Sequence, residues 1–164
     1  MFPVTIVYVE NLECLGYCYN NVATELGDAG YKESVQEPEN RTFAQFHKDY
    51  TNKMKTLIIS ELRKENPILR LVLATIALGM GLDAPSITQI IHFRTPTTLE
   101  QYMQEIGRAG SNGQQSQAIL NYNKNDIVKK RKKFHNKLLQ KLILSEKGTN
   151  GTFWFSKFQQ NFLD

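Results

Sequence analysis

The chain has 164 residues, a formal net charge of +4, 41% hydrophobic residues and 22% charged residues. This length and balance predict one globular domain with a real core and exclude a disordered chain. No apolar run approaches the roughly 20 residues that cross a bilayer, and no secretory signal is recognisable, so we expect a nuclear or cytoplasmic protein that is neither secreted nor bound to a membrane. The two cysteines, Cys14 and Cys18, have no histidine cluster nearby and predict neither a disulfide framework nor a metal site.

The first half of the chain alternates between strand and helix patterns. Residues 3–9 are apolar and β-branched, which is typical of a buried parallel strand. Asn11 can cap a helix that continues to about Leu26. The polar residues 31–45 predict a loop, and apolar residues at helical spacing predict a second helix over about 52–64.

The second half continues this alternation. It predicts buried strands over 69–74, 88–93 and 116–122, a helix over 96–106 and a long final helix over about 126–144. Strands alternating with helices predict an α/β fold with a mostly parallel sheet and helices on both faces. Ligands of such sheets gather at the carboxyl ends of the strands, and we expect the loops 75–83 and 107–113 to leave from those ends or lie next to them.

The C-terminal part of the chain changes in composition. We divide the sequence into a domain over 1–124, a basic helix over 125–147 and an aromatic-rich tail over 148–164 that either caps the domain or stays loose. An unbroken basic run in the helix includes Lys129, Lys130 and Arg131. Such a run can neutralise nucleic-acid phosphates. A solvated helix face and a nuclear-import signal are the alternatives.

The first segment with recognisable chemistry follows the predicted strand over 69–74. Its glycines would let backbone amides approach an anion, because they have no Cβ atom and tolerate positive φ. Thr75 offers a hydroxyl to a phosphate oxygen, and Asp83 offers an acceptor to a ribose hydroxyl. A purely structural turn explains the glycines about equally well.

The second segment is Gln104–Gly113, which reads QEIGRAGSNG. Helical spacing would place Gln104 and Arg108 on one face, four residues apart. Gly107 and Gly110 would leave Arg108 unobstructed at a helix end, where its guanidinium could grip phosphate oxygens in a bidentate manner. The alternative is a capped helix end with an arginine that faces solvent.

Together the two segments resemble a known family. The stretches ATIALGMGLDAP and IIHFRTPTTLEQYMQEIGRAGSNGQ resemble the fifth and sixth signature motifs of superfamily 2 helicases, in the wording of the RecQ family. The stretches TIVYVEN and AILNYNKNDI extend the resemblance over roughly residues 3–130. The resemblance implies the second RecA-like domain of an ATP-dependent 3′–5′ DNA helicase, with a three-layer RecA-like sandwich. It also implies ATP with Mg²⁺ as cofactor, DNA as partner, and work in DNA repair and recombination in the nucleus.

The same resemblance assigns roles to individual residues. Thr75 would touch the nucleic-acid backbone. Gly81 and Asp83 would line the ribose side of the nucleotide. Gln104 and Arg108 would face the ATP phosphates, as the catalytic groups of this domain.

Two departures from the family pattern limit the expected activity. The family usually reads GRAGR-x-G and uses the second arginine as its finger on the γ-phosphate, but this sequence has Ser111 at that position. No glycine is followed by lysine and no two acidic residues are adjacent, so neither the GxxxxGK[ST] phosphate cradle nor the DExH magnesium motif occurs. Both belong to the first RecA-like domain of the family. The tail also lacks the cysteines of the family's zinc module.

These departures leave three hypotheses. We expect the chain to be a helicase fragment, a truncated product or a degenerate copy that does not hydrolyse ATP alone. The runner-up is a non-catalytic module that binds nucleic acid or a helicase partner. A third hypothesis, an α/β enzyme of unrelated chemistry, has little support, because His47, His92 and His135 are scattered and are interpreted as packed or surface side chains.

Overall fold

The computed structural model describes residues 2–33, 36–75, 84–93, 96–110, 113–123 and 150–157. Within these ranges a six-stranded sheet has the order β2-β3-β1-β4-β5-β6. The strands are β1 (Val4–Tyr8), β2 (Phe43–Phe46), β3 (Leu71–Ala74), β4 (Ile87–His92), β5 (Ser116–Asn123) and β6 (Asn150–Lys157). The helices are α1 (Leu12–Leu26), α2 (Asn52–Leu62) and α3 (Leu99–Ile106), with 3₁₀ turns η1 (Gly27–Gly30) and η2 (Pro38–Asn40).

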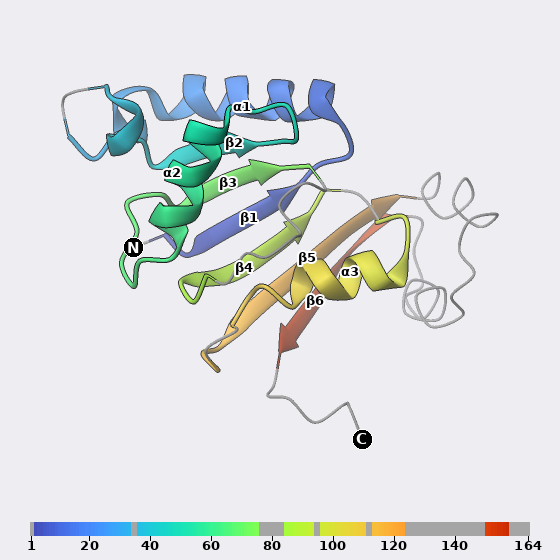
Figure 1. The fold of residues 1–164 in the computed structure, drawn as a ribbon. Helices are drawn as coiled ribbons and strands as arrows, with labels where there is room; N and C mark the ends of the chain where they lie inside the picture. Colours follow the sequence, from blue (N-terminus) through green and yellow to red (C-terminus); the bar gives the residue numbers. More distant parts are fainter. Residues whose placement is uncertain are drawn as a thin grey trace.

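Strands β1 to β5 run parallel, and β6 is antiparallel to β5 (Figure 1). Alternate residues of β1 face opposite sides of this sheet. Ile6 and Tyr8 join the core beneath α2 and the end of α3, whereas Val7 and Val9 pack against α1. The predicted α/β fold, with a mostly parallel sheet and helices on both faces, is therefore confirmed.

Helices α1 and α2 begin where the sequence predicts, whereas α3 begins at Leu99, three residues after the predicted start at 96. The Asn11 side chain accepts a hydrogen bond from the backbone N–H of Cys14 at 2.8 Å, and threonine hydroxyls cap α2 and α3 in the same way. The apolar stripe of α1 is buried at Leu15, whereas Leu12, the first residue of the helix, is exposed. Helix α2 ends at Leu62, two residues before the predicted end.

The predicted loop over 31–45 is wrong at its C-terminal end, because β2 begins at Phe43. The strand has only four residues, and no extended alternation marks it in the sequence. Its extended conformation is fixed by pairing with β3, in which Phe43 is opposite Leu71 and Phe46 is opposite Ala74. Tertiary pairing thus decides a segment whose local pattern predicts a loop.

Strand β6 is a second element that the sequence pattern does not predict. It pairs with β5 over its full length, from Asn123 opposite Asn150 to Ser116 opposite Lys157. The sheet therefore includes residues beyond position 124, where the composition predicts the end of the domain. The predicted helix over 126–144 and the basic run Lys129, Lys130 and Arg131 lie outside the described residues.

Candidate functional site

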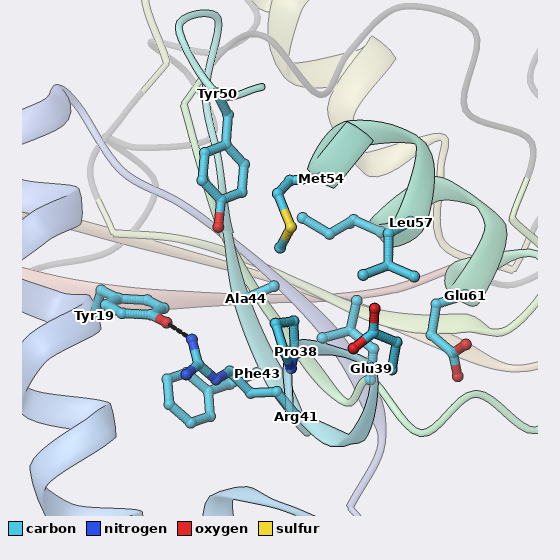
Figure 2. A pocket seen from close by; sticks show the side chains of 12 residues that line it. Tyr19, Pro38, Glu39, Arg41, Phe43, Ala44, Tyr50, Met54, Leu57 and Glu61 are labelled. Atoms are coloured by element: carbon cyan, nitrogen blue, oxygen red, sulfur yellow. Dashed lines mark hydrogen bonds between the residues drawn. The ribbon is translucent and has the colours of Figure 1, made fainter. Parts of the chain in front are cut away.

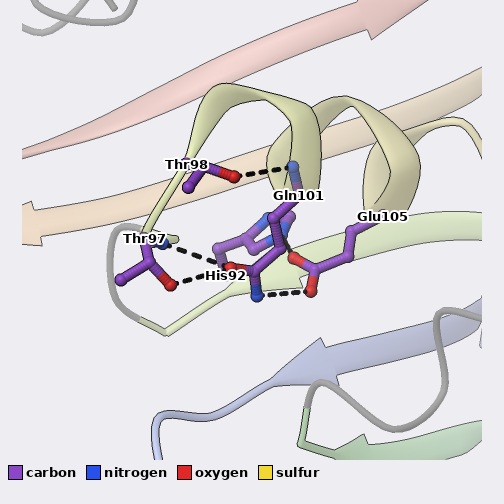
Figure 3. A network of polar contacts seen from close by, with 5 residues as sticks. All are labelled: His92, Thr97, Thr98, Gln101 and Glu105. Atoms are coloured by element: carbon purple, nitrogen blue, oxygen red, sulfur yellow. Dashed lines mark hydrogen bonds and ion pairs between the residues drawn. The ribbon is translucent and has the colours of Figure 1, made fainter. Parts of the chain in front are cut away.

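Helix α3 is fastened at its first turn by threonine and glutamine side chains (Figure 3). The hydroxyl of Thr98 accepts from the backbone N–H of Gln101 at 3.1 Å. The backbone N–H and the hydroxyl of Thr97 donate to the Gln101 side-chain oxygen, at 3.3 and 2.9 Å. These bonds satisfy donors at the helix start and leave the Gln101 amide nitrogen to donate to Glu105 Oε1 at 2.9 Å.

A buried hydrogen-bonded pair joins α3 to the end of β4. His92 Nε2 lies 2.7 Å from Glu105 Oε2, and the two residues are only 1% and 3% exposed. The His92 ring stacks on Tyr8, with ring centroids 5.2 Å apart, and also touches Tyr102. A carboxylate in such a position is tolerated only when it is paired and hydrogen-bonded, so this cluster fixes how α3 lies on the sheet. His92 is thus a packed histidine, as expected.

The hydroxyl of Tyr8 lies beside this cluster, at the carboxyl end of β1. It is buried and has no hydrogen-bond partner among the described residues. Burial raises the pKa of Tyr8, the negative charge of Glu105 raises it further, and the positive charge of Arg108 opposes both. The charges of α3 and of the turn after it therefore both act on the end of β1.

Arg108 lies in the turn that follows α3, not on the helix. The helix ends at Ile106, and the backbone N–H of Arg108 donates to the carbonyl of Glu105 at 3.2 Å. The predicted helical spacing from Gln104 therefore extends only to Ile106, and Arg108 follows it in a tighter turn. Gln104 is exposed on α3, whereas Arg108 is half-buried.

The described part of this turn, Gly107–Gly110, lies near the amino end of β4. The N–H of Gly110 donates to the carbonyl of Ile87, the first residue of β4, at 3.0 Å. The expectation that the loop 107–113 lies next to the carboxyl ends of the strands is wrong at this position. The reason is that α3 begins beyond the carboxyl end of β4 and runs antiparallel to the strands. The helix therefore ends near the amino ends of the strands (Figure 1).

Glycine is required at position 110. Gly110 has a φ of +67°, and a Cβ atom there would lie 2.6 Å from the Gln114 carbonyl oxygen and 2.7 Å from Ser116 Oγ. The preceding residue, Ala109, is 1% exposed and belongs to the main core. The turn that carries Arg108 is thus held between the core and the start of β5.

Thr75 lies directly after β3, at the carboxyl end of that strand, as predicted. Its N–H donates to the carbonyl of Phe46 at 3.2 Å, and the preceding Ala74 is opposite Tyr8 of β1. Tyr8 therefore lies between the carboxyl end of β3, where Thr75 follows, and the His92–Glu105 pair that anchors α3. The other predicted site residues lie outside the described residues: Gly81, Asp83, Ser111, Lys129, Lys130 and Arg131.

The sequence reasoning missed the cluster formed by Tyr8, His92, Gln101 and Glu105. A signal was present in part, because Gln101 and Glu105 are four residues apart on a predicted helix. Their meeting with His92 depends on how α3 crosses β4, which no local pattern specifies.

No helix in the described ranges is long and apolar enough to span a membrane. In the same residues no three His, Cys, Asp or Glu side chains gather into a group that could hold a metal ion.

Comparison with known proteins places this geometry in a family. Residues 6–113 match the helicase conserved C-terminal domain. The chain is 45% identical over 67 residues to ATP-dependent DNA helicase Q-like 5 of Arabidopsis thaliana, which covers 41% of this chain and 7% of that protein. It is 41% identical over 81 residues to the RecQ-like DNA helicase BLM of Xenopus laevis, covering 49% of this chain and 5% of that protein. The chain thus spans less than a tenth of these relatives.

A solved structure confirms the RecA-like fold. Dbp5 of Saccharomyces cerevisiae, bound to RNA and ADP BeF3, superimposes with a TM-score of 0.59 at 18% identity, over 82% of this chain and 33% of that one. Identity at this level shows the fold alone. Taken with the matched residues 6–113, it leads to one conclusion: the chain belongs to the helicase conserved C-terminal domain family, and the stretches it shares with the two relatives are similar to RecQ-like DNA helicases.

Proposed function

We propose that this chain works as the second motor domain of an ATP-dependent 3′–5′ DNA helicase, in which it completes the ATP site and contacts DNA. The observation that carries the proposal is the fastened Arg108 turn. Its backbone is bonded to the first residue of β4, and the His92–Glu105 pair fixes the helix before it. A guanidinium on such a support is pre-organised for phosphate oxygens.

The chemistry of Arg108 and Gln104 fits nucleotide phosphates. Arg108 offers a guanidinium fork, and Gln104 offers an exposed amide on α3. Phosphate cradling and Mg²⁺ binding would come from a first RecA-like domain, because the residues for both are missing from this sequence. We assign Thr75, Lys129, Lys130 and Arg131 to DNA contact, and Gly81 and Asp83 to the ribose side.

Ser111 sets the expected rate. A serine hydroxyl is short and neutral, so it cannot stabilise the charge of a transferring phosphoryl group as an arginine does. We therefore propose that the chain alone hydrolyses no ATP and that hydrolysis stays slow even beside a first RecA-like domain. We propose a nuclear or cytoplasmic location and a role in DNA repair or recombination on family grounds.

Ser111 also supports a second candidate function. A domain without its finger arginine could serve as a non-catalytic module that binds nucleic acid or a helicase partner. Its basic run would then contact phosphates, and DNA affinity would fall steeply as salt increases.

The test joins the full chain to the first RecA-like domain of a RecQ-like relative and measures phosphate release with single-stranded DNA. Linking the domains supplies the high effective concentration that a weak interface needs. We expect slow hydrolysis in the fusion and an increase of about a hundredfold or more in its Ser111→Arg variant.

The non-catalytic alternative predicts a different outcome. If Ser111→Arg yields no hydrolysis while the chain still binds DNA in a salt-dependent manner, the motor function is wrong and the binding module is supported. Absence of both hydrolysis and DNA binding would contradict both functions.

A further inference from the structure

A shallow, open pocket lies at the β2 edge of the sheet (Figure 2). Its lining includes Tyr19 of α1, Phe43 and Ala44 of β2, and Met54 and Leu57 of α2. Phe43 packs against Tyr19, with ring centroids 5.2 Å apart, whereas α2 lies on the opposite face of the sheet. The pocket therefore straddles the outer edge of β2 and is lined from both layers.

Strand β2 is the last strand at this end of the sheet order, and its ladder partner is β3. From Phe43 to Phe46 its outer edge therefore presents backbone N–H and C=O groups that no other described strand pairs with, whereas residues 30–32 already pair with residues 40–42 just before it. Edge strands are usually protected by lysine, proline or a bulge. The residues of β2, FAQF, supply none of these.

Arg41 supplies a positive charge at this edge without an acidic partner among the described residues. Its guanidinium lies 6.0, 5.2 and 5.4 Å from the ring centroids of Tyr19, Tyr31 and Phe43. It donates to the hydroxyls of Tyr19 and Tyr31, the second at 2.6 Å. Its Nε–H is buried and has no hydrogen-bond partner among the residues that the structure describes.

This cluster is rich in donors and poor in acceptors. Each of the two phenol oxygens accepts from Arg41, so each hydroxyl still has its own hydrogen to donate. No carboxylate in the described ranges forms an ion pair with Arg41. A negatively charged group at this position would satisfy the guanidinium and the hydroxyls together.

The two glutamates of the pocket do not fill this role. Glu61 is already bonded, to Lys64 Nζ at 2.5 Å and to the N–H of Ile68 at 2.6 Å. Glu39 is exposed and forms no ion pair with Arg41 in the described part of the chain. The pocket thus combines an unneutralised cation on the α1 side with apolar side chains on the α2 side.

We propose that this groove binds an extended segment of a partner protein, added as a strand to the edge of β2. Side chains of a strand alternate between two faces, so one row would meet Arg41 and the other would meet Met54 and Leu57. The segment therefore alternates acidic and apolar residues. β2 is the edge strand of the sheet, whereas α3 is joined to β4, which is two strands further in than β3 (Figure 1). The proposal is therefore independent of the helicase function.

The test uses the full chain and a labelled, end-blocked peptide, Thr-Phe-Asp-Val-Glu-Leu-Thr, with binding followed by fluorescence anisotropy. We expect saturable binding. Replacing its Asp and Glu by Asn and Gln should weaken binding by about tenfold or more, because a charge-assisted hydrogen bond is lost. N-methylation of the backbone nitrogens that face β2 should abolish binding.

Two variants of the chain locate the contact. Arg41→Gln should weaken binding of the acidic peptide by about tenfold and leave the amide peptide unaffected. Glu39→Gln is the matched control in the same pocket and should leave binding unchanged or tighter. The peptide substitutions test the same contact on an unchanged protein, so a folding defect in Arg41→Gln cannot mask the result.

Three outcomes would overturn the proposal. The first is no binding up to about 1 mM peptide. The second is equal affinity for the acidic and amide peptides. The third is dimerisation of the chain in sedimentation experiments that is lost in Arg41→Gln, which would show that a second copy occupies this edge.

Discussion

At the scale of single residues, the buried pair of Glu105 and His92 determines how the candidate site is held. Its carboxylate has a partner for each oxygen, His92 for one and Gln101 for the other. Removing one partner of a buried pair leaves an uncompensated polar group, which costs more than the pair itself contributes.

We therefore expect Glu105→Ala to lower the free energy of unfolding by about 3 kcal/mol or more. Glu105→Gln, which keeps the shape and can still bond to His92, should cost less than half of that. Urea denaturation measures both values. A loss below about 1 kcal/mol in the alanine variant would show that the pair does not anchor α3.

The ionisation of Tyr102 should make the free energy of unfolding depend on pH in the alkaline range. Burial raises its pKa from 10.0 to about 12. The unfolded chain therefore loses this proton at a lower pH than the folded chain. The contribution to stability is complete below the unfolded pKa and is lost as pH rises through the folded value.

The free energy of unfolding should thus fall between about pH 10 and pH 12, and Tyr102→Phe should make this fall shallower. Tyr17→Phe is the control, because Tyr17 is 72% exposed. Urea midpoints at a series of pH values would check this. An identical pH dependence in Tyr102→Phe and the unsubstituted chain would refute the role given to burial.

At the scale of elements, the turn after α3 carries Arg108 and is held in place by its own packing against the core and β5. Gly110 and Gly113 both have positive φ, but a Cβ atom added at Gly110 would meet neighbouring atoms, whereas one added at Gly113 would meet none within 4 Å. Substitutions at both positions would strain the backbone, but only a substitution at Gly110 would also cause a steric clash.

We predict that Gly110→Ala destabilises the fold by about 2–5 kcal/mol, whereas Gly113→Ala, which is strained without a clash, costs about 1–2 kcal/mol. Thermal unfolding of both variants would test this. Equal losses would mean that the contacts with Gln114 and Ser116 do not hold the turn.

In helix α1 a glycine-to-alanine substitution is expected to stabilise the protein. Gly16 lies in its interior, and an added Cβ atom there would meet nothing within 4 Å. Alanine is the better helix former by about 0.5–1 kcal/mol, so Gly16→Ala should raise stability by that amount. A lower midpoint in urea would show that this face of α1 needs glycine.

At the scale of the whole molecule, the sequence is sufficient where local pattern and tertiary structure agree. The β-branched run at 3–9 and the cap at Asn11 each predict the observed element. Thr75 is expected at a strand end, and it follows β3 there. These features depend on residues close together in the chain.

Features that depend on distant residues escape the local pattern. Strand β2 exists because Phe43–Phe46 pairs with β3, and β6 exists because it pairs with β5. The position of Arg108 depends on the return path of α3 and on the bond from Gly110 to Ile87. The end of the helix at Ile106 is predicted from the sequence, but the tighter turn that carries Arg108 after it is not.

The most direct test is phosphate release by the fusion that carries Ser111→Arg, compared with the same protein carrying Arg108→Ala or Arg108→Lys. If Arg108 faces the phosphates, Arg108→Ala should reduce the rate by about a hundredfold or more, and lysine should restore little, because it lacks the bidentate fork. Arg63→Ala, an exposed arginine at the end of α2, should leave the rate unchanged. An unchanged rate in Arg108→Ala would contradict the assignment of this domain to the ATP site.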